Sequence, residues 1–489
     1  MIISFIIMNW TYIIIGCYLL ILILVCLRII YETFSSTKAL AYLFFCIFVP
    51  VIGIVFYLAF GINYWQRKLY DKKTGENDKF LEQLKNEIND YNAASIDPGD
   101  DPGDASELAA MLLKDLQSPL TRNNRLKLLL NGEEKFPELL QCMQEAKHHI
   151  HLEYYIYEQD AIGSAIIDML IKKSQEGINV RFIYDDFGSP AIKKKLEKRM
   201  RAAGIEIFPF SKVHFYLLAN RINYRNHRKI VIIDGKTGFT GGINVSDKYI
   251  NDKNNKDKLY WRDTHLRIDG PGVHFLQYIF ITDWNFCCER KIKPEAIYFH
   301  HDRSIKEGSL VQIAASGPDS VQPTILFSIL QAIYLAKKEI LITTPYFIPG
   351  DAITYALRVA ALSGLSVKLL VPGKCDSKLV NAASKAHYED LLIAGVDIYM
   401  YNKGFVHAKT LVTDGILSII GTANMDHRSF ELNFEVNAIV YEAAFASQLR
   451  KVFFDDLEEA EKLDPEKWYN RSIWTQLPEK FARLLSPSL

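Results

Sequence analysis

The sequence predicts an α/β protein made by internal duplication, in which two similar units related by a pseudo-two-fold axis follow a pair of transmembrane helices. Three observations support this fold class. The first 66 residues are almost free of charge, segments of the later chain recur in the same order, and one short polar motif is written twice.

The N-terminal 66 residues contain two apolar runs. Residues 1–27 carry no charged side chain, and neither do residues 39–66. Because a membrane-spanning helix needs ~20 mostly apolar residues, we expect a transmembrane hairpin over 1–66, with spans at about 4–27 and 39–62. A cleaved signal peptide is disfavoured, since a basic n-region is missing and a second run follows closely.

Basic residues and cysteines predict on which side of the membrane the chain after the hairpin lies. Two basic residues lie between the apolar runs and four follow the second: Arg28 and Lys38, then Arg67, Lys68, Lys72 and Lys73. The positive-inside rule therefore favours a cytoplasmic location for the chain that follows the hairpin. The seven cysteines form no C-x-x-C pair, which fits a reducing compartment. The balance of 57 Lys+Arg and 57 Asp+Glu argues against a nucleic-acid partner.

The rest of the chain repeats itself. Residues 67–110 read as a polar juxtamembrane segment with a linker, DPGDDPGD, at 97–104. After it, AKHHIHLEYYIY (146–157) resembles AKKEILITTPYFIP (336–349), and AGIEIFPF (203–210) resembles AGVDIYMY (394–401). Each pair alternates a helix end with a buried strand, which predicts two domains, 111–300 and 301–489, with mixed sheets flanked by helices.

Each predicted domain contains the same polar motif. NHRKIVIIDG (226–235) and VHAKTLVTDG (406–415) share H-x-K-x4-D, and a small-residue turn with asparagine follows both. Side chains alternate along a strand, so histidine and lysine share a face. One copy would be weak evidence, but two in matching repeats are strong. The residues are His227, Lys229, Asp234 and Asn244, and His407, Lys409, Asp414 and Asn424.

This set of side chains suits phosphodiester transfer. Two lysines and two asparagines can hold the phosphate and the extra charge of its transition state. One imidazole can attack phosphorus while the other moves protons. Each imidazole needs an orienting carboxylate, and Asp263 and Glu435 are the candidates. Asp234 and Asp414 end the motif strands and are expected to hold the motif in place. No metal or other cofactor is required, because the lysines supply positive charge and ammonium is not a metal ligand.

The doubled motif resembles the phospholipase D superfamily, and the whole chain resembles its bacterial cardiolipin synthase branch. The stretches that carry the resemblance are ALAYLFFCIFVPVIGIVFYLAFG, WRDTHLRIDGPG, QIAASGPD and GTANMDHRSFELNFEVN. The resemblance implies two phospholipase D-like domains and a multi-pass protein of the cell (inner) membrane. It implies that phosphatidylglycerol and membrane lipids are the partners, and that two phosphatidylglycerol molecules give cardiolipin and glycerol through a phosphohistidine.

By the same resemblance His227 is the nucleophile and His407 the general acid/base, with the reverse assignment open. A phospholipase D-type hydrolase, a transferase with another phospholipid alcohol as acceptor, a nuclease and a non-enzymatic scaffold are the alternatives. Oligomeric state and acyl preference are not predicted. The segments HFYLLANRINY (214–224) and FARLLSPSL (481–489) are further candidates for contact with lipid.

Overall fold

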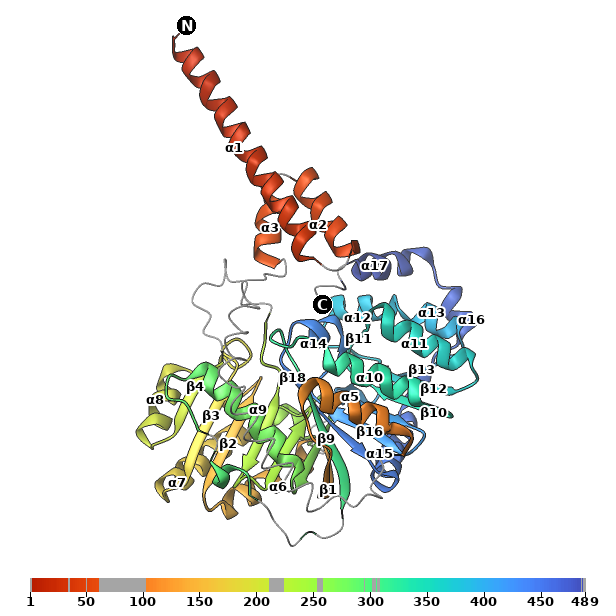
Figure 1. The fold of residues 1–489 in the computed structure, drawn as a ribbon. Helices are drawn as coiled ribbons and strands as arrows, with labels where there is room; N and C mark the ends of the chain where they lie inside the picture. The colour runs from red at the N-terminus through yellow and green to blue at the C-terminus, as the bar shows by residue number, and fades with distance from the viewer. Residues whose placement is uncertain are drawn as a thin grey trace. The chain divides into compact units, whose positions relative to one another are not determined.

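The computed structural model describes residues 2–33, 36–49, 51–60, 103–210, 224–252, 258–293, 295–300, 305, 308–484 and 486. The chain divides into a small unit, residues 1–72 with 213–223, and a large unit, residues 73–212 and 224–489 (Figure 1). The basic residues at 67–73, the linker up to residue 102 and the aromatic segment up to residue 223 lie outside the described residues.

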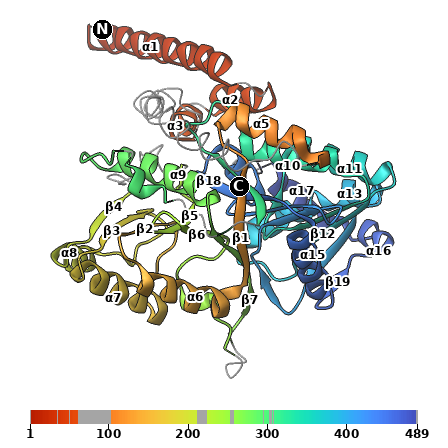
Figure 2. The same ribbon diagram turned by 60° about the horizontal axis from the view of Figure 1, so that its bottom comes forward.

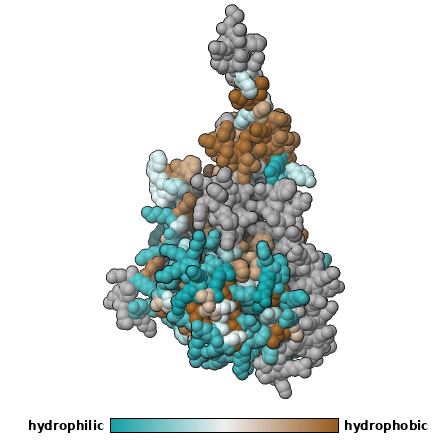
Figure 3. Space-filling model, turned by 90° about the vertical axis from the view of Figure 1, so that its left-hand side faces the viewer, coloured by the Kyte–Doolittle hydropathy of each residue, from teal (hydrophilic) through white to brown (hydrophobic). Residues whose placement is uncertain are grey.

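The small unit contains one helix long and apolar enough to cross a membrane among its described residues. Helix α1 runs from Ile2 to Glu32, and its stretch Tyr12–Glu32 meets the length and composition of a span. Figure 3 shows the apolar surface that the helices of this unit present, while the face of the large unit in that view is mainly hydrophilic. The first predicted span is therefore matched by a continuous apolar helix.

The second apolar run does not form one continuous helix. It is divided into α2, Ser36–Phe48, and α3, Ile52–Phe60, around the proline that the sequence has at position 50. The rings of Tyr42 and Tyr57 lie 5.4 Å apart, so α3 folds back along α2. The 13 residues of α2 rise about 20 Å, which is less than a hydrocarbon core of about 30 Å. The predicted two-span hairpin is thus seen only in its first half.

The large unit is built on one mixed sheet of 15 strands in the order β19-β13-β12-β10-β15-β16-β18-β9-β1-β8-β6-β5-β2-β3-β4. The first-repeat strands are β1 Thr121–Leu130, β2 His149–Tyr154, β3 Asn179–Tyr184, β4 Glu206–Pro209, β5 Lys229–Ile233, β6 Thr237–Gly241 and β8 Thr264–Asp269. The second-repeat strands are β9 Ser309–Ser316, β10 Glu339–Thr343, β12 Ser366–Pro372, β13 Asp397–Tyr401, β15 Thr410–Thr413, β16 Leu417–Gly421, β18 Glu435–Tyr441 and β19 Ala460–Lys462.

The strand order shows the duplication directly. From β1 outward the first half reads β1-β8-β6-β5-β2-β3-β4, and from β9 outward the second reads β9-β18-β16-β15-β10-β12-β13. Each motif strand, β5 or β15, lies between equivalent neighbours. The halves meet where β1 and β9 run antiparallel, with Thr121 opposite Val311. The predicted pseudo-two-fold α/β arrangement is confirmed, and the two sheets join into one.

Helices cover both faces of each half (Figure 2). The helices are α5 Ser106–Leu116, α6 Asn131–Glu145, α7 Ala161–Gln175, α8 Lys194–Ala202, α9 Gly272–Cys287, α10 Thr324–Leu335, α11 Gly350–Leu362, α12 Lys378–Lys385, α13 Tyr388–Ile393, α14 His427–Glu431, α15 Ala443–Leu457, α16 Pro465–Tyr469 and α17 Ile473–Arg483. Each repeat has its own hydrophobic core. Apolar side chains of α6, α7 and α8 pack into the core of the first repeat, and those of α10, α11 and α13 pack into the core of the second. Leu108 and Leu112 of α5 also lie in the second core, although α5 precedes the first repeat. The extents 111–300 and 301–489 remain proposals.

Candidate active site

The motif aspartates hold the ends of the motif strands. Asp234 has a φ of +53°, and its carboxylate accepts hydrogen bonds from the backbone N–H groups of residues 147–149 at 2.8–3.2 Å. Asp414, with a φ of +54°, accepts from residues 337–339 at 2.7–2.8 Å. Each aspartate therefore ties its motif strand to the start of the neighbouring strand, as a strand-end anchor would.

The motif lysines are buried beside their own histidines. Lys229 is 0% exposed, and its Nζ donates to the carbonyl oxygen of His227 at 2.7 Å. Lys409 donates in the same way to the carbonyl oxygen of His407. This matching geometry confirms that histidine and lysine lie on one face of the chain in both copies.

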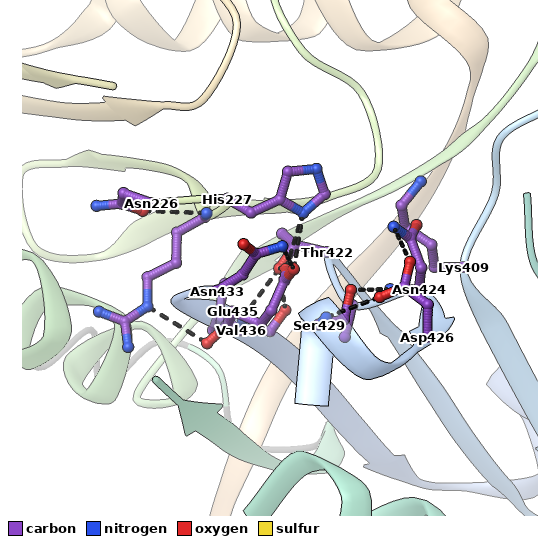
Figure 4. A network of polar contacts seen from close by, with 12 residues as sticks. Asn226, His227, Lys409, Thr422, Asn424, Asp426, Ser429, Asn433, Glu435 and Val436 are labelled. Atoms are coloured by element: carbon purple, nitrogen blue, oxygen red, sulfur yellow. Dashed lines mark hydrogen bonds and ion pairs between the residues drawn. The ribbon is translucent and has the colours of Figure 1, made fainter. Parts of the chain in front are cut away.

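Each motif histidine is bonded to a carboxylate of the other repeat. His227 Nδ1 lies 2.9 Å from both carboxylate oxygens of Glu435 (Figure 4). His407 Nδ1 lies 2.7 Å from Oδ2 of Asp263. The sequence predicted both acids, but it did not predict that the pairs cross between the repeats. One site is therefore assembled from both halves of the large unit.

Short backbone pairings between the repeats bring these residues together. The N–H of His227 donates to the carbonyl of Phe434 at 2.9 Å, directly before Glu435. On the other side β14, Gly404–Val406, pairs in parallel with β7, Tyr260–Arg262, and the N–H of His407 donates to the carbonyl of Arg262 at 2.7 Å. The two connections are equivalent under the pseudo-two-fold relation.

The two turns differ at one position, which from the sequence alone we interpret as ordinary variation; the structure gives this difference a role. Thr422 occupies the position of Gly242, and its hydroxyl donates to Oε2 of Glu435. A Cβ atom built on Gly242 would instead overlap the carboxylate of Asp263. The longer glutamate therefore occurs with a threonine donor, and the shorter aspartate with a glycine that leaves it room. This match between each acid and the turn residue beside it can be recognised only when the pairing across the repeats is known.

The two asparagines predicted to bind phosphate are buried beside the motif strands. Oδ1 of Asn244 accepts from the N–H of Ile156 at 3.2 Å, and its Nδ2 donates to the hydroxyl of Tyr249 at 2.9 Å. Nδ2 of Asn424 donates to Asp426 at 3.1 Å. An amide nitrogen carries two hydrogens, so the contacts among the described residues leave each asparagine one N–H for a ligand.

Burial sets the protonation of the site. Desolvation lowers the pKa of His227 to about 4, against the raising effect of Glu435. Desolvation together with Lys409 lowers the pKa of His407 to about 3. Both rings are then neutral near pH 7. Because Nδ1–H is donated to the carboxylate, the lone pair lies on Nε2, and in Figure 4 this nitrogen of His227 points away from Glu435.

The lysines and one carboxylate are shifted as well. Desolvation lowers the pKa of Lys229 to about 7 and that of Lys409 to about 8. The negative charges of Glu435 and Asp263 act in the opposite direction on both lysines. Burial alone would raise the pKa of Glu435, but His227 and Lys229 hold it below its usual value. A bound phosphodiester would supply the negative charge that restores the lysine pKa values.

Aromatic rings pack against both histidines. The ring of Tyr155 meets that of His227 edge-on with centroids 4.8 Å apart. The rings of Trp261 and Phe405 lie 5.5 and 5.7 Å from that of His407. These contacts limit rotation of the imidazoles and reduce the water around them, which agrees with the lowered pKa values.

Arg228 lies between the two motif residues of the first copy and faces away from them. It is buried, donates from Nη1 to Asp283, and donates from Nε to the backbone oxygen of Glu435 at 3.3 Å. It therefore supports the backbone next to Glu435 as a structural residue.

Comparison with known proteins agrees with this geometry. A family profile described as cardiolipin synthase, PLD-like domain, matches residues 139–265 and 329–457, one match for each repeat. A cardiolipin synthase of Geobacillus kaustophilus is 41% identical over 90% of this chain and 86% of its own. The major cardiolipin synthase of Bacillus subtilis is 39% identical over 96% of this chain and 98% of its own.

A solved structure shows the same fold at low identity. The phosphatidylserine synthase of Haemophilus influenzae superposes with a TM-score of 0.57 at 14% identity, covering 78% of this chain and all of that one. With two profile matches on the two repeats, and with relatives at about 40% identity along most of its length, the chain belongs to the cardiolipin synthase family of proteins with phospholipase D-like domains.

Proposed function

We propose that the protein is a membrane-bound phosphatidyltransferase that makes cardiolipin and glycerol from two molecules of phosphatidylglycerol. The observation that carries this proposal is the crossed pairing of His227 with Glu435 and of His407 with Asp263, beside two buried lysines. The family to which the chain belongs supports the choice of lipids.

In the first half-reaction Nε2 of His227 attacks the phosphorus of one phosphatidylglycerol. The P–N bond forms, and the bond from phosphorus to the glycerol headgroup oxygen breaks. His407, whose ring takes up a proton from solvent as the anionic phosphodiester binds beside it, gives this proton to the departing oxygen, and glycerol leaves. Lys229 and Lys409, with the free N–H groups of the motif asparagines, would hold the non-bridging oxygens as negative charge grows on them.

In the second half-reaction His407 accepts a proton from the headgroup hydroxyl of a second phosphatidylglycerol. That oxygen attacks the phosphohistidine, the P–N bond breaks, and cardiolipin is released. One phosphodiester is exchanged for another, so no nucleotide is needed. Glu435 holds the Nδ1–H of His227 throughout and compensates the positive charge that the ring acquires in the intermediate.

A phospholipase D-type hydrolase is the second candidate, because water would need the same groups. A transferase with another phospholipid alcohol as acceptor also remains, as does the exchange of the two histidine roles, since both rings have equivalent partners.

The test is incubation of detergent-solubilised protein with phosphatidylglycerol alone, followed by mass spectrometry of the lipids. Cardiolipin and glycerol in equal amounts are expected, and His227→Ala and His407→Ala should abolish both. Phosphatidic acid without cardiolipin would favour the hydrolase. Lipid phosphate trapped on histidine in His407→Ala but not in His227→Ala would support the proposed roles, and the opposite result would exchange them.

We also propose that the small unit anchors the protein in the cell (inner) membrane, with both repeats on the cytoplasmic side. The apolar helix α1 and the basic residues around the second apolar run support this proposal. A multi-pass arrangement would require α2 and α3 to open into one helix. Labelling of single cysteines introduced at Thr33 and Lys114, with a reagent that does not cross membranes, tests it: a second crossing places these positions on opposite sides.

A further inference from the structure

The C-terminal helix α17 presents an apolar face to solvent. Ile473, Trp474, Leu477, Phe481 and Leu484 are all exposed, Trp474 by 79% and Leu484 by 74% of their surface. At 100° per residue these five positions fall within an arc of about 100°, so they form one continuous stripe. A stripe of large exposed apolar side chains is unusual on a soluble surface and marks an interaction site.

The opposite face of α17 is already occupied. Ala482 is buried with Ala383 of α12 and Ile348 of β11, Phe347–Ile348. Arg471 forms a two-pronged ion pair with buried Glu479, at 2.9 Å for both contacts. The helix is therefore docked on the large unit with its polar and small residues inward, and its apolar stripe cannot turn into the core of this unit.

The docking point of α17 lies next to the second motif turn. Ile348 pairs with Asp426 in the short ladder between β11 and β17, Met425–Asp426. Asp426 in turn accepts from the side chain of Asn424. Three steps, from Ala482 to Ile348, to Asp426 and to Asn424, thus connect the inner face of α17 with the second motif turn. Figure 1 shows α17, α12, α14 and β11 grouped at one end of the second repeat.

Charge favours a lipid surface over a protein partner. Arg483 is exposed on α17 beside the stripe, and exposed Lys378 begins the neighbouring α12; Lys480, also exposed beside the stripe, pairs with Glu389 at 3.0 Å. An apolar face with an exposed tryptophan and flanking basic residues is the pattern of helices that lie in the interface of an anionic bilayer.

We propose that α17 is an interfacial helix, which inserts its stripe into the headgroup and acyl boundary of an anionic bilayer and holds the active site against that surface. The contact with lipid follows from the exposed stripe alone. Its purpose, delivery of a lipid substrate to the site, rests on the proposed function.

Tryptophan fluorescence of the full chain in vesicles tests the contact. The protein is reconstituted into phosphatidylglycerol–phosphatidylcholine vesicles with and without brominated acyl chains, and the emission of Trp474→Phe is subtracted from that of the unaltered protein. The difference belongs to Trp474 and is expected to be quenched by bromine. An unquenched difference overturns the proposal. The measurement does not depend on turnover, so it stands even if no cardiolipin forms and the proposed function fails.

The activity of a double variant tests whether α17 helps to deliver a lipid substrate to the site. Leu477→Ser/Phe481→Ser should lower cardiolipin formation in vesicles roughly tenfold, because two apolar side chains no longer leave water. Its rate on short-chain phosphatidylglycerol dispersed as monomers should equal that of the unaltered protein. The matched control, Leu113→Ser/Ile297→Ser, removes two exposed apolar side chains elsewhere and should change neither rate. Equal losses on both substrates, or loss of self-association in detergent, would overturn the lipid assignment.

Discussion

Replacing Thr422 by valine deletes one buried hydroxyl and keeps the shape of the side chain. Thr422 and Glu435 are both 0% exposed, so no water replaces the lost donor. A hydrogen bond to a charged group contributes about 1.5–3 kcal/mol. The same hydroxyl accepts a hydrogen bond from the N–H of Val436 at 2.9 Å, and leaving this buried donor unpaired costs about 1–3 kcal/mol more. We therefore expect the free energy of unfolding to fall by about 2.5–6 kcal/mol in Thr422→Val.

The same substitution should lower kcat. Glu435 keeps its contacts with His227, but the hydroxyl that fixes its second oxygen is gone. A small misplacement of a catalytic group costs up to about a hundredfold, so we expect kcat to fall by about tenfold to a hundredfold. KM should stay within about twofold, because both lysines are untouched. Initial rates of cardiolipin formation and thermal unfolding in detergent measure the two effects.

Two further variants make the result interpretable. Thr422→Ser keeps the hydroxyl and should restore most of the rate. Thr240→Val is the matched control, because Thr240 is fully buried and no hydrogen-bond partner is found for its hydroxyl among the described residues. Full activity in Thr422→Val, or a rate of Thr422→Ser no better than that of Thr422→Val, would refute the role of this hydroxyl.

Three other predictions follow from the site. The pKa values of about 7 for Lys229 and about 8 for Lys409 mean that both lose their protons as pH rises. KM should therefore rise by roughly a thousandfold between pH 6.5 and pH 9, since each pH unit above a pKa costs about 1.4 kcal/mol to reprotonate the group, over about two units for Lys229 and about one for Lys409; a flat KM would contradict this. Asp234→Ala should destabilise the protein by about 2–3 kcal/mol in thermal unfolding, because three backbone donors lose their acceptor, whereas Asp234→Asn should lose less because asparagine tolerates positive φ. Gly242→Ala should lower kcat at least about tenfold, because the new methyl group displaces Asp263, and a normal rate would show that this carboxylate has room to move.

The sequence was sufficient to predict the repeat and to name the histidines, lysines and acids that the structure brings together. Strands with buried side chains on both faces, such as IVII after Lys229, are visible without a structure, and so is the shared face of each histidine and lysine. The choice of Asp263 and Glu435 followed from equivalent places in the two copies. Local patterns of this kind predict elements and candidate residues, because the periodicity of a strand is written in consecutive positions.

Contacts between distant segments could not be predicted in the same way. The pairing of His227 with Glu435 depends on backbone hydrogen bonds between residues more than two hundred positions apart, and no local pattern encodes them. The role of Thr422 depends on that pairing and was missed with it. The second apolar run was predicted as one span from its composition, but hydropathy does not register a reversal of direction around position 50.

That reversal decides how often the chain passes through the bilayer. If α2 and α3 enter and leave by the same face, α1 makes the single passage of the small unit, and the basic residues before and after the second apolar run gather on one side. The N-terminus then lies across the bilayer from the catalytic repeats. If the reversal opens, the number of passages becomes even and the N-terminus returns to their side. The accessibility of an N-terminal tag thus shows whether the chain crosses the bilayer once or twice.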